Sequence, residues 1–142
     1  MLYPGRNVLI VDFGTAVTID LVTADNTFRG GCISPGVTMR FRALHDYTAK
    51  LPLCAATGGE GLSGLTTEEA IELGVMNGIA FEIEGYVTRM REKIDGLRVI
   101  FTGGDAKFFV KRIKNTIFAN CNLVFCGLNR ILEYNASEEH LN

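Results

Sequence analysis

The sequence lacks the features that mark membrane-spanning, zinc-binding and nucleic-acid-binding proteins. No run of apolar residues is longer than four, as at residues 8–11, whereas a helix that spans a bilayer needs about 20. The four cysteines form no C-x-x-C pair, and only two histidines accompany them, so no zinc site is expected. The 14 basic and 16 acidic side chains give a net charge of −2, which does not favour nucleic acid as a partner.

The composition also excludes intrinsic disorder. Hydrophobic residues make up 47% of the chain and charged residues 21%, which supplies enough apolar surface for a core. The 142 residues match the size of one domain. No secretory signal peptide is expected, because the first residues lack a basic stretch followed by an apolar one. Cysteines inside apolar segments, such as Cys126, are typical of buried thiols in a reducing compartment, so a cytoplasmic location is expected.

Hydrophobic periodicity predicts strands first and then alternating helices and strands. An apolar, β-branched strand over 7–13 and an alternating strand over 16–23 are separated by a short glycine turn, and a third strand covers 27–33. Tight turns between them predict a three-stranded antiparallel meander. The remaining predicted elements are helices over 37–49, 67–94, 106–113 and 128–134 and strands over 98–101 and 122–126. The expected fold class is α/β, a single domain over 1–142 with helices on the faces of a mixed sheet.

The segment between the first two predicted helices is rich in glycine. Four glycines fall within residues 57–64, and a segment of this composition is expected to be mobile. Thr67 is predicted to cap the following helix, since two glutamates come directly after it. Along that helix Ala70, Gly74 and Gly78 recur every four residues. These small residues suit either packing within the domain or contact with a second subunit, and the spacing does not decide between them.

A first candidate site is the motif D-F-G-T-A at residues 12–16. Here a carboxylate at a strand end precedes a glycine turn and a hydroxyl. Backbone N–H groups converge at such a turn and glycine lets a phosphate approach, while Thr15 adds a donor. Asp12 would hold an accompanying cation rather than the phosphate itself. A plain hairpin turn capped by Asp12 explains the same residues.

A second candidate site is the motif T-G-G-D at residues 102–105, between a predicted strand and a predicted helix. Two glycines let a flat ring or a sugar lie against the backbone, and a helix N-terminus favours an anion. A connecting loop that needs a positive φ angle explains the same motif. The helix that follows is basic, which indicates either a solvated surface or a face that steers phosphate. Its basic residues are Lys107, Lys111, Arg112 and Lys114.

Taken in order, these motifs resemble those of the type III pantothenate kinase family. Residues 11–20, V-D-F-G-T-A-V-T-I-D, are similar to the second phosphate-binding segment of that family, and residues 28–36 to its third strand and turn. Further similar segments lie at residues 43–44, 48–52, 67–74, 102–106 and 126–128 and at Asn135. The resemblance therefore covers nearly the whole chain.

The resemblance implies a ribonuclease-H-like domain, one half of the duplicated fold of the actin and sugar-kinase superfamily. Family members are homodimers that phosphorylate pantothenate with ATP and Mg²⁺ in coenzyme A biosynthesis, and they use a monovalent cation, K⁺ or NH₄⁺. The resemblance assigns the cation to Asp12 and pantothenate to Thr67. It assigns the nucleotide to Gly14, Thr15, Gly103 and Gly104.

The chain resembles the C-terminal half of that family alone. The N-terminal half of the family contributes a D-x-G-N-T-like phosphate loop and the aspartate that acts as general base. Neither occurs in these 142 residues, so no catalytic residue is assigned and the chain alone is expected to be inactive. Two alternatives stay open. One is a regulatory module accessory to transcription with vestigial nucleotide contacts, and the other is half of a different actin-like kinase.

Overall fold

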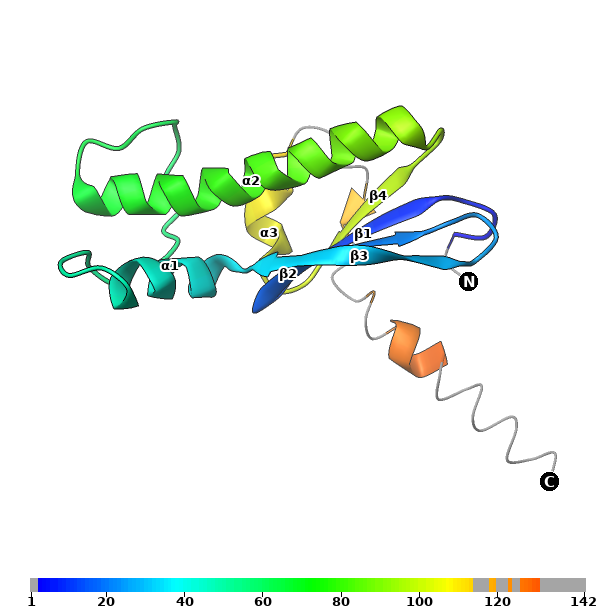
Figure 1. Ribbon diagram of the computed structural model, residues 1–142, viewed down its shortest axis with the longest axis horizontal. Coiled ribbons are helices and arrows are strands. Elements are labelled where there is room, and N and C mark those ends of the chain that lie inside the picture. The colour runs from blue at the N-terminus through cyan, green and yellow to red at the C-terminus, as the bar shows by residue number, and fades with distance from the viewer. Residues whose placement is uncertain (1–2, 114–117, 120–122, 124–125, 131–142) are drawn as a thin grey trace, which may run out of the picture.

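Within the part of the chain that the structure describes, five strands form one mixed sheet in the order β3-β2-β1-β4-β5 (Figure 1). The computed structural model describes residues 3–113, 118–119, 123 and 126–130. β1 (Val8–Phe13) pairs antiparallel with β2 (Ala16–Val22), which pairs antiparallel with β3 (Phe28–Pro35). On its other side β1 runs parallel to β4 (Arg98–Thr102), and β4 runs parallel to β5 (Phe118–Ala119). The predicted mixed sheet with helices is confirmed.

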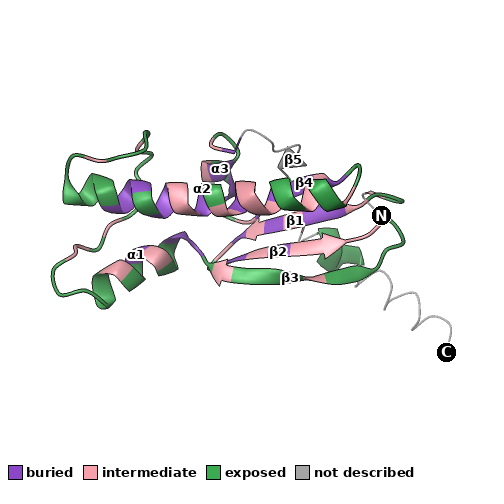
Figure 2. Ribbon diagram, turned by 45° about the horizontal axis from the view of Figure 1, so that its top comes forward, coloured by how far each residue is buried: buried purple, intermediate pink, exposed green. Residues whose placement is uncertain are grey.

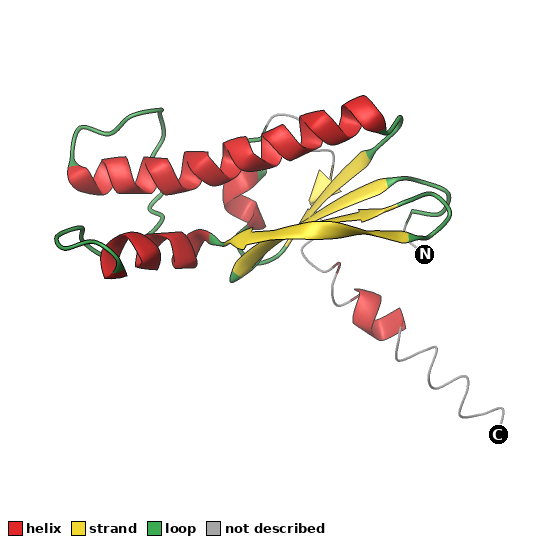
Figure 3. Cartoon of the chain, in the orientation of Figure 1, coloured by secondary structure: helices red, strands yellow, loops and turns green. Residues whose placement is uncertain are grey.

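The helices lie on the sheet and beyond its end. α1 (Val37–Asp46) continues from β3, α2 (Thr67–Lys93) crosses one face of the sheet, and the short α3 (Ala106–Phe109) follows β4. In Figures 1 and 3, α1 and the N-terminal part of α2 extend past the strands and run beside each other. Helical residues 126–130 lie on the opposite side of the sheet from α2. Within the described residues no helix is both long and apolar enough to cross a membrane.

The core lies between α2 and the sheet, because side chains alternate between the two faces of each strand. Val11 and Phe13 are buried with the apolar side of α2 (Figure 2), whereas Asp12 between them lies on the opposite face. The Phe13 ring packs edge-on against Phe101, with centroids 4.9 Å apart, and stacks on Phe109 at 4.6 Å. This aromatic packing fixes the end of β1, where the D-F-G-T-A turn begins.

The N-cap of α2 is Thr66, so the prediction of Thr67 is wrong. The Thr66 hydroxyl accepts the Glu69 N–H at 3.2 Å, and the Glu69 carboxylate accepts the Thr66 N–H at 3.3 Å, which forms a capping box. Thr67 cannot form this pair because Ala70, three residues later, has no carboxylate. The predicted end of this helix is confirmed, since α2 ends at Lys93.

Two helices are shorter than predicted. α1 ends at Asp46 rather than at 49, and the Thr48 hydroxyl donates to the carbonyl of Leu44 in the last turn. α3 ends at Phe109 rather than at 113, and hydrogen-bonded turns continue from it to Ile113. In both places the chain keeps local hydrogen bonds while it leaves the helical path.

The prediction of the last strand is wrong. β5 occupies Phe118–Ala119, whereas Leu123 and Cys126 of the predicted strand 122–126 are helical. Both segments are short and apolar, and such runs do not distinguish a strand from a helix. The predicted closing helix 128–134 is confirmed for 128–130, and its remaining residues lie outside the described part of the chain.

The prediction of buried thiols is also wrong for two cysteines. Cys32 on the edge strand β3 and Cys126 are exposed free thiols, and Cys54 is half-buried. An edge strand such as β3 has a neighbour on one side only, which leaves its side chains less covered. Cys121 lies outside the described residues. The cytoplasmic location inferred from buried thiols therefore stays a prediction.

The glycine-rich segment 57–64 is bound to α2 and to the turns after α3. Glu72 of α2 is 7% exposed, and its carboxylate accepts the backbone N–H groups of residues 57–59 at 2.6 to 3.0 Å. Arg112 donates to the carbonyl of Gly59, and Asn77 donates to the carbonyl of Gly61 at 2.8 Å. These contacts anchor a segment whose glycine content predicts mobility.

Candidate functional site

The candidate site lies where three loops meet, at the end of the sheet where β1, β3 and β4 finish. The β1–β2 turn is in the middle, flanked by the junction of β3 with α1 and by the β4–α3 turn. The Gly36 N–H donates to the Thr15 carbonyl at 3.1 Å, and the Asp105 N–H donates to the Phe13 carbonyl at 3.1 Å. The two glycine-containing motifs, far apart in the sequence, are thereby joined through the backbone.

Gly103 allows the β4–α3 turn to approach the end of β1. Its φ angle is 93°, a conformation that favours glycine. A Cβ atom there would collide with the Asp12 carboxylate and lie 2.6 Å from the Phe13 carbonyl oxygen. Gly104 differs, because it has no positive φ angle and a Cβ atom would meet no neighbour within 4 Å. Close packing therefore requires a glycine at position 103. It does not require one at position 104, where the backbone is free to face a ligand.

On the other side of the turn, Gly36 allows the junction of β3 with α1 to approach equally closely. A Cβ atom on Gly36 would collide with the carbonyl oxygens of Gly14 and Thr15 and lie 2.9 Å from the Thr15 carbonyl carbon. The Gly14 N–H closes the turn by donating to the Ala16 carbonyl at 3.2 Å. The D-F-G-T-A turn is thus held on both sides, while the side chain of Thr15 is exposed.

A groove of about 510 Å³ opens beside this turn, between α1 and the β4–α3 turn. It is lined by Phe13, Gly14, Thr15, Thr38, Met39, Arg42, Gly104 and Asp105. The predicted nucleotide residues Gly14, Thr15 and Gly104 therefore face one space. A hydroxyl, an exposed glycine turn and a guanidinium together suit an anion such as a phosphate.

The sequence analysis missed Thr38 and Arg42, which α1 contributes to this groove. They are four residues apart in a helix, so both lie on the same face. The sequence carries no local signal for them, because their place at the groove depends on the direction in which α1 leaves β3. Arg42 is exposed, and within the described part of the chain it has no hydrogen-bond or ion-pair partner.

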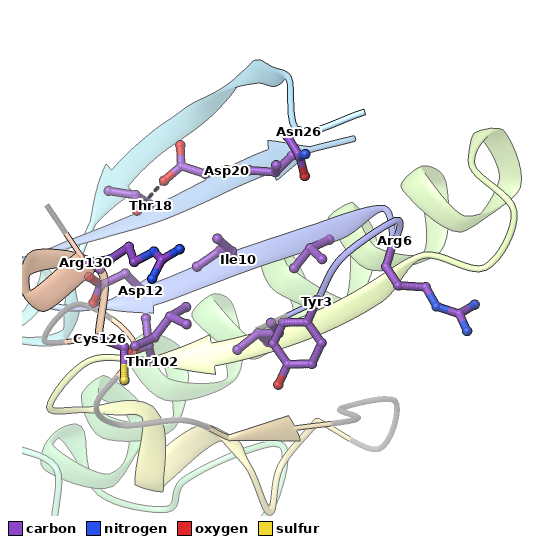
Figure 4. A pocket seen from close by; sticks show the side chains of 15 residues that line it. Tyr3, Arg6, Ile10, Asp12, Thr18, Asp20, Asn26, Thr102, Cys126 and Arg130 are labelled. Atoms are coloured by element: carbon purple, nitrogen blue, oxygen red, sulfur yellow. Dashed lines mark hydrogen bonds between the residues drawn. The ribbon is translucent and has the colours of Figure 1, made fainter. Parts of the chain in front are cut away.

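On the face of the sheet away from α2, Asp12 and Asp20 line a cavity of about 610 Å³ (Figure 4). Burial raises the pKa of the Asp12 carboxyl above its ordinary value, and the charge of Asp20 raises it further. Thr18 donates to the Asp20 carboxylate at 3.1 Å. Thr102 lies opposite Asp12 in the β1–β4 register and is 1% exposed. Its hydroxyl has no hydrogen-bond partner among the described residues.

This face has the chemistry of a site for a hard cation. The Asp12 carboxylate, whose pKa the charge of Asp20 raises, would be stabilised by a nearby positive charge, and the buried Thr102 hydroxyl without a partner offers a further oxygen ligand. No group of three or more His, Cys, Asp or Glu side chains that could hold a metal is found in the described residues. The oxygen donors present therefore fit a weakly held cation at Asp12 better than a transition metal.

The structure does not bring Thr67 to this site. Thr67 is exposed at the start of α2, the end that projects past the sheet, whereas the three loops meet at the edge of the sheet (Figure 1). Of the basic residues after the T-G-G-D motif, Arg112 is bound to the glycine-rich segment and Lys107 lies 5.2 Å from the centroid of the Phe108 ring. Lys114 lies outside the described residues.

Comparison with known proteins connects this geometry to one family. A family model described as type III pantothenate kinase matches residues 1–89. The chain is 46% identical over 132 residues to the type III pantothenate kinase of Flavobacterium psychrophilum, which covers 93% of this chain and 55% of the relative. It is 48% identical over 134 residues to that of Phocaeicola vulgatus, with 94% and 55% covered. The chain spans about half the length of these curated relatives.

The fold also occurs among solved structures, one of which matches most of this chain. It is described as a conserved putative Baf family transcriptional activator from Campylobacter jejuni, and it superposes with a TM-score of 0.68 at 24% sequence identity. The match covers 93% of this chain and 60% of that chain. At this identity the likeness concerns the fold alone.

Proposed function

The chain belongs to the type III pantothenate kinase family, and we propose that it supplies the nucleotide- and cation-binding part of an ATP-dependent pantothenate kinase. The observation that carries this proposal is the convergence of the β1–β2 and β4–α3 turns on one groove beside Thr15. Phosphoryl transfer depends on positioning and on charge stabilisation. A turn braced on both sides and lined by a hydroxyl and an arginine provides both.

We propose a role for each residue that the family resemblance singles out. Thr15, with Gly14, binds the phosphates of Mg²⁺-ATP in the groove. Gly104 faces the adenosine, while Gly103 holds the turn against Asp12. Thr67 contacts pantothenate, and because it lies apart from the groove in this chain, the site it serves is that of a partner subunit. The strand order with antiparallel β3-β2-β1 and parallel β4 and β5 supports a ribonuclease-H-like domain.

A monovalent cation, K⁺ or NH₄⁺, is proposed to bind at Asp12. The residues present fit such an ion, because Asp12 and Asp20 repel each other and Thr102 has a buried hydroxyl without a partner. When bound, the cation supplies positive charge close to the nucleotide phosphates. Asp12 holds that charge, and the absence of a side chain at Gly103 leaves room for the Asp12 carboxylate.

We further propose that these 142 residues do not catalyse the reaction alone. They correspond to about half of each curated relative, in our interpretation the C-terminal half. The other half is expected to contribute a phosphate loop and the general base, and a general base is commonly worth about 10² to 10⁴ in rate. Asp105 lines the groove but lies in the nucleotide region, so we do not assign it as a base.

A reconstitution experiment tests the proposed function. The chain is mixed with the N-terminal half of the Flavobacterium psychrophilum relative, and phosphopantothenate formation from ATP is measured with and without K⁺. We expect K⁺-dependent product from the mixture and none from the chain alone. Asp12→Asn is expected to lower the rate by about tenfold or more, because it removes the charge that holds the cation.

Three results would contradict the proposal. Turnover by the chain alone, abolished by changing one of its own carboxylates, would show that no further half is needed. A mixture that forms a complex but gives no product and binds no ATP would favour a regulatory module. A mixture that binds ATP without accepting pantothenate would favour half of another actin-like kinase.

We propose that the chain dimerises through α2. Ala70 and Gly74 are exposed, and a Cβ atom on Gly74 would meet no neighbour within 4 Å, so internal packing does not explain this small residue. Light scattering is expected to give a dimer mass, and Gly74→Lys is expected to give a monomer although lysine is the better helix former. Gly74→Ala, which keeps the side chain small, should remain dimeric. A monomer mass for the unchanged chain at tens of micromolar would contradict the proposal.

A further inference from the structure

A half-buried ion pair joins α1 to α2 beside the last residues of β3. The guanidinium of Arg40 on α1 binds the carboxylate of Glu82 on α2 at 2.5 Å, and the two side chains are 22% and 24% exposed. The Ser34 hydroxyl donates to the other oxygen of the same carboxylate at 2.5 Å. The Arg40 Nε–H donates to the Pro35 carbonyl at 2.8 Å. One arginine therefore ties α1, α2 and the end of β3 to one another.

The contact between Arg40 and Pro35 reaches the D-F-G-T-A turn through a single peptide unit. The Pro35 carbonyl and the Gly36 N–H belong to the same peptide, which is planar and trans, so the two groups point in opposite directions. Arg40 binds the carbonyl, and the N–H donates to the Thr15 carbonyl at 3.1 Å. An arginine that holds the carbonyl therefore also sets the direction of the N–H that braces Thr15.

Arg40 also fixes the helix that carries two residues of the groove. Thr38 and Arg42 line the groove beside Thr15, whereas Arg40, between them in the sequence, does not. Residues two apart on a helix do not share a face, and Arg40 lies on the side of α1 that contacts α2. The ion pair thus holds α1 from behind while the other side of the helix presents Thr38 and Arg42 to the groove.

Gly78 on α2 leaves room for the Arg40 guanidinium. A Cβ atom on Gly78 would lie 3.8 Å from Nη1 of Arg40, which is an ordinary contact, so a side chain longer than that of alanine would crowd the guanidinium. The spacing of the small residues on α2 leaves open whether they serve packing within the domain or contact with a second subunit. Gly78 packs within the domain, whereas a Cβ atom on Gly74 would meet no neighbour within 4 Å.

We propose that Arg40 is a positioning residue for the nucleotide site, because it holds the Thr15 turn through the Pro35–Gly36 peptide. Glu82 and Ser34 orient the guanidinium for this contact. Arg40 itself touches no substrate, since it lies outside the groove. This inference rests on the proposed function, which places the ATP phosphates at Thr15. Loss of the contact therefore weakens the binding of ATP and not that of pantothenate.

Arg40→Lys tests this role, because it keeps the positive charge and removes the planar fork. A lysine ammonium can stay with Glu82, but it does not reproduce the two-sided contact with the carboxylate and the Pro35 carbonyl. In the chain mixed with the N-terminal half of the Flavobacterium psychrophilum relative, the KM for ATP is expected to rise about fivefold, as one lost hydrogen bond predicts. The KM for pantothenate should not change. A merely structural role would lower kcat through a smaller folded fraction and leave both KM values unchanged.

Two further variants separate positioning from stability. Glu82→Gln removes the charge of the pair but leaves the bond from Arg40 to the Pro35 carbonyl, so the KM for ATP is expected to rise by no more than about twofold. Arg29→Lys makes the same chemical change as Arg40→Lys near the other end of β3. Arg29 there pairs with Asp25, and the two side chains are 53% and 59% exposed, so this variant should leave both KM values unchanged.

Hydrogen exchange of the chain alone adds a readout that requires no activity. Arg40→Lys is expected to lower the protection of the Gly36 amide about fivefold and to leave the amides of β1 unchanged. If the KM for ATP stays unchanged in Arg40→Lys, or if it rises as much in Glu82→Gln, the inference is wrong. K⁺-dependent turnover by the unchanged mixture would then still support the proposed function. If the unchanged mixture binds no ATP, the proposed function fails, and the inference fails with it.

Discussion

Gly103→Ala is expected to destabilise the chain by about 3 kcal/mol or more, whereas Gly104→Ala is expected to change its stability by less than about 1 kcal/mol. Gly103 has a φ angle of 93°, and a Cβ atom there would overlap with backbone atoms of Phe13. Backbone cannot move aside as the end of a flexible side chain can. Gly104, the adjacent glycine, meets neither obstacle.

The free energy of unfolding, measured by urea titration, tests this difference. Gly104→Ala is the matched control, because it makes the same chemical change one residue away. If the two variants unfold at similar urea concentrations, the close approach of the two turns does not exist in solution. The proposed site would then lose the contact that joins its two halves.

The two glycines also separate stability from binding. If Gly104 faces the adenosine, Gly104→Ala should weaken ATP binding in the reconstituted mixture while the chain stays folded. Gly103→Ala should lose both together, because the turn that carries Gly104 rests on the end of β1. The double-glycine motif thus contains one residue required by packing and one available for the ligand.

The sequence predicts the strands well where alternation and turn signals agree. β1 is a short apolar, β-branched run and β2 alternates between apolar and polar residues, and the glycine between the strands is where the chain turns. Prediction fails at residues 118–126, where two short apolar runs compete and only tertiary contacts choose between them. The Thr66 cap, in contrast, was predictable, because Thr66, unlike Thr67, has a glutamate three residues later.

The candidate site, like the strands, could be predicted from the sequence only in part. Asp12, Thr15 and Gly104 could be proposed from their motifs, because a local turn carries the chemical signal. Arg42 could not be assigned to the groove from sequence alone, since its position depends on the direction in which α1 leaves β3. Local sequence describes each loop, whereas the meeting of three loops follows from the strand order and from the close packing that Gly36 and Gly103 allow.

Glu72 is the residue that a closer look at helical periodicity would have found. It shares a face of α2 with Val75, Met76 and Ile79, which are buried. A charge on such a face requires hydrogen-bond partners, because a buried carboxylate without them is costly. The glycine-rich segment supplies them, since small residues let three successive N–H groups converge on one oxygen.

Glu72→Ala is therefore expected to destabilise the chain by about 2 kcal/mol or more and to release the segment 57–64. The substitution removes a carboxylate that accepts three N–H groups and the Thr57 hydroxyl. Hydrogen exchange should show lost protection at residues 57–59 and little change at the β1–β2 turn. Glu68→Ala is the control, because Glu68 lies exposed one helical turn earlier, and it should cost less than about 1 kcal/mol.

Lowering the pH should release the segment 57–64 as Glu72→Ala does, because acid neutralises the Glu72 carboxylate. Burial raises the pKa of Glu72, but the hydrogen bonds from Thr57, Gly59 and Gly58 outweigh burial and hold the pKa below its ordinary value. A carboxyl group whose pKa is lowered by folding stabilises the fold above the unfolded pKa, about 4.3 for glutamate. That contribution is lost as the pH falls through the lower folded pKa.

Protection at residues 57–59 is thus expected to decline below about pH 4 in the unchanged chain. Glu72→Gln, which keeps the shape but not the charge, should begin with weaker protection and show no such decline. Glu68→Gln should keep the pH dependence of the unchanged chain. If Glu72→Gln still lost protection with acid, the Glu72 carboxylate would not be the group that anchors the segment 57–64. The hydrogen bonds from Arg112 and Asn77 to the carbonyls of this segment would then anchor it instead.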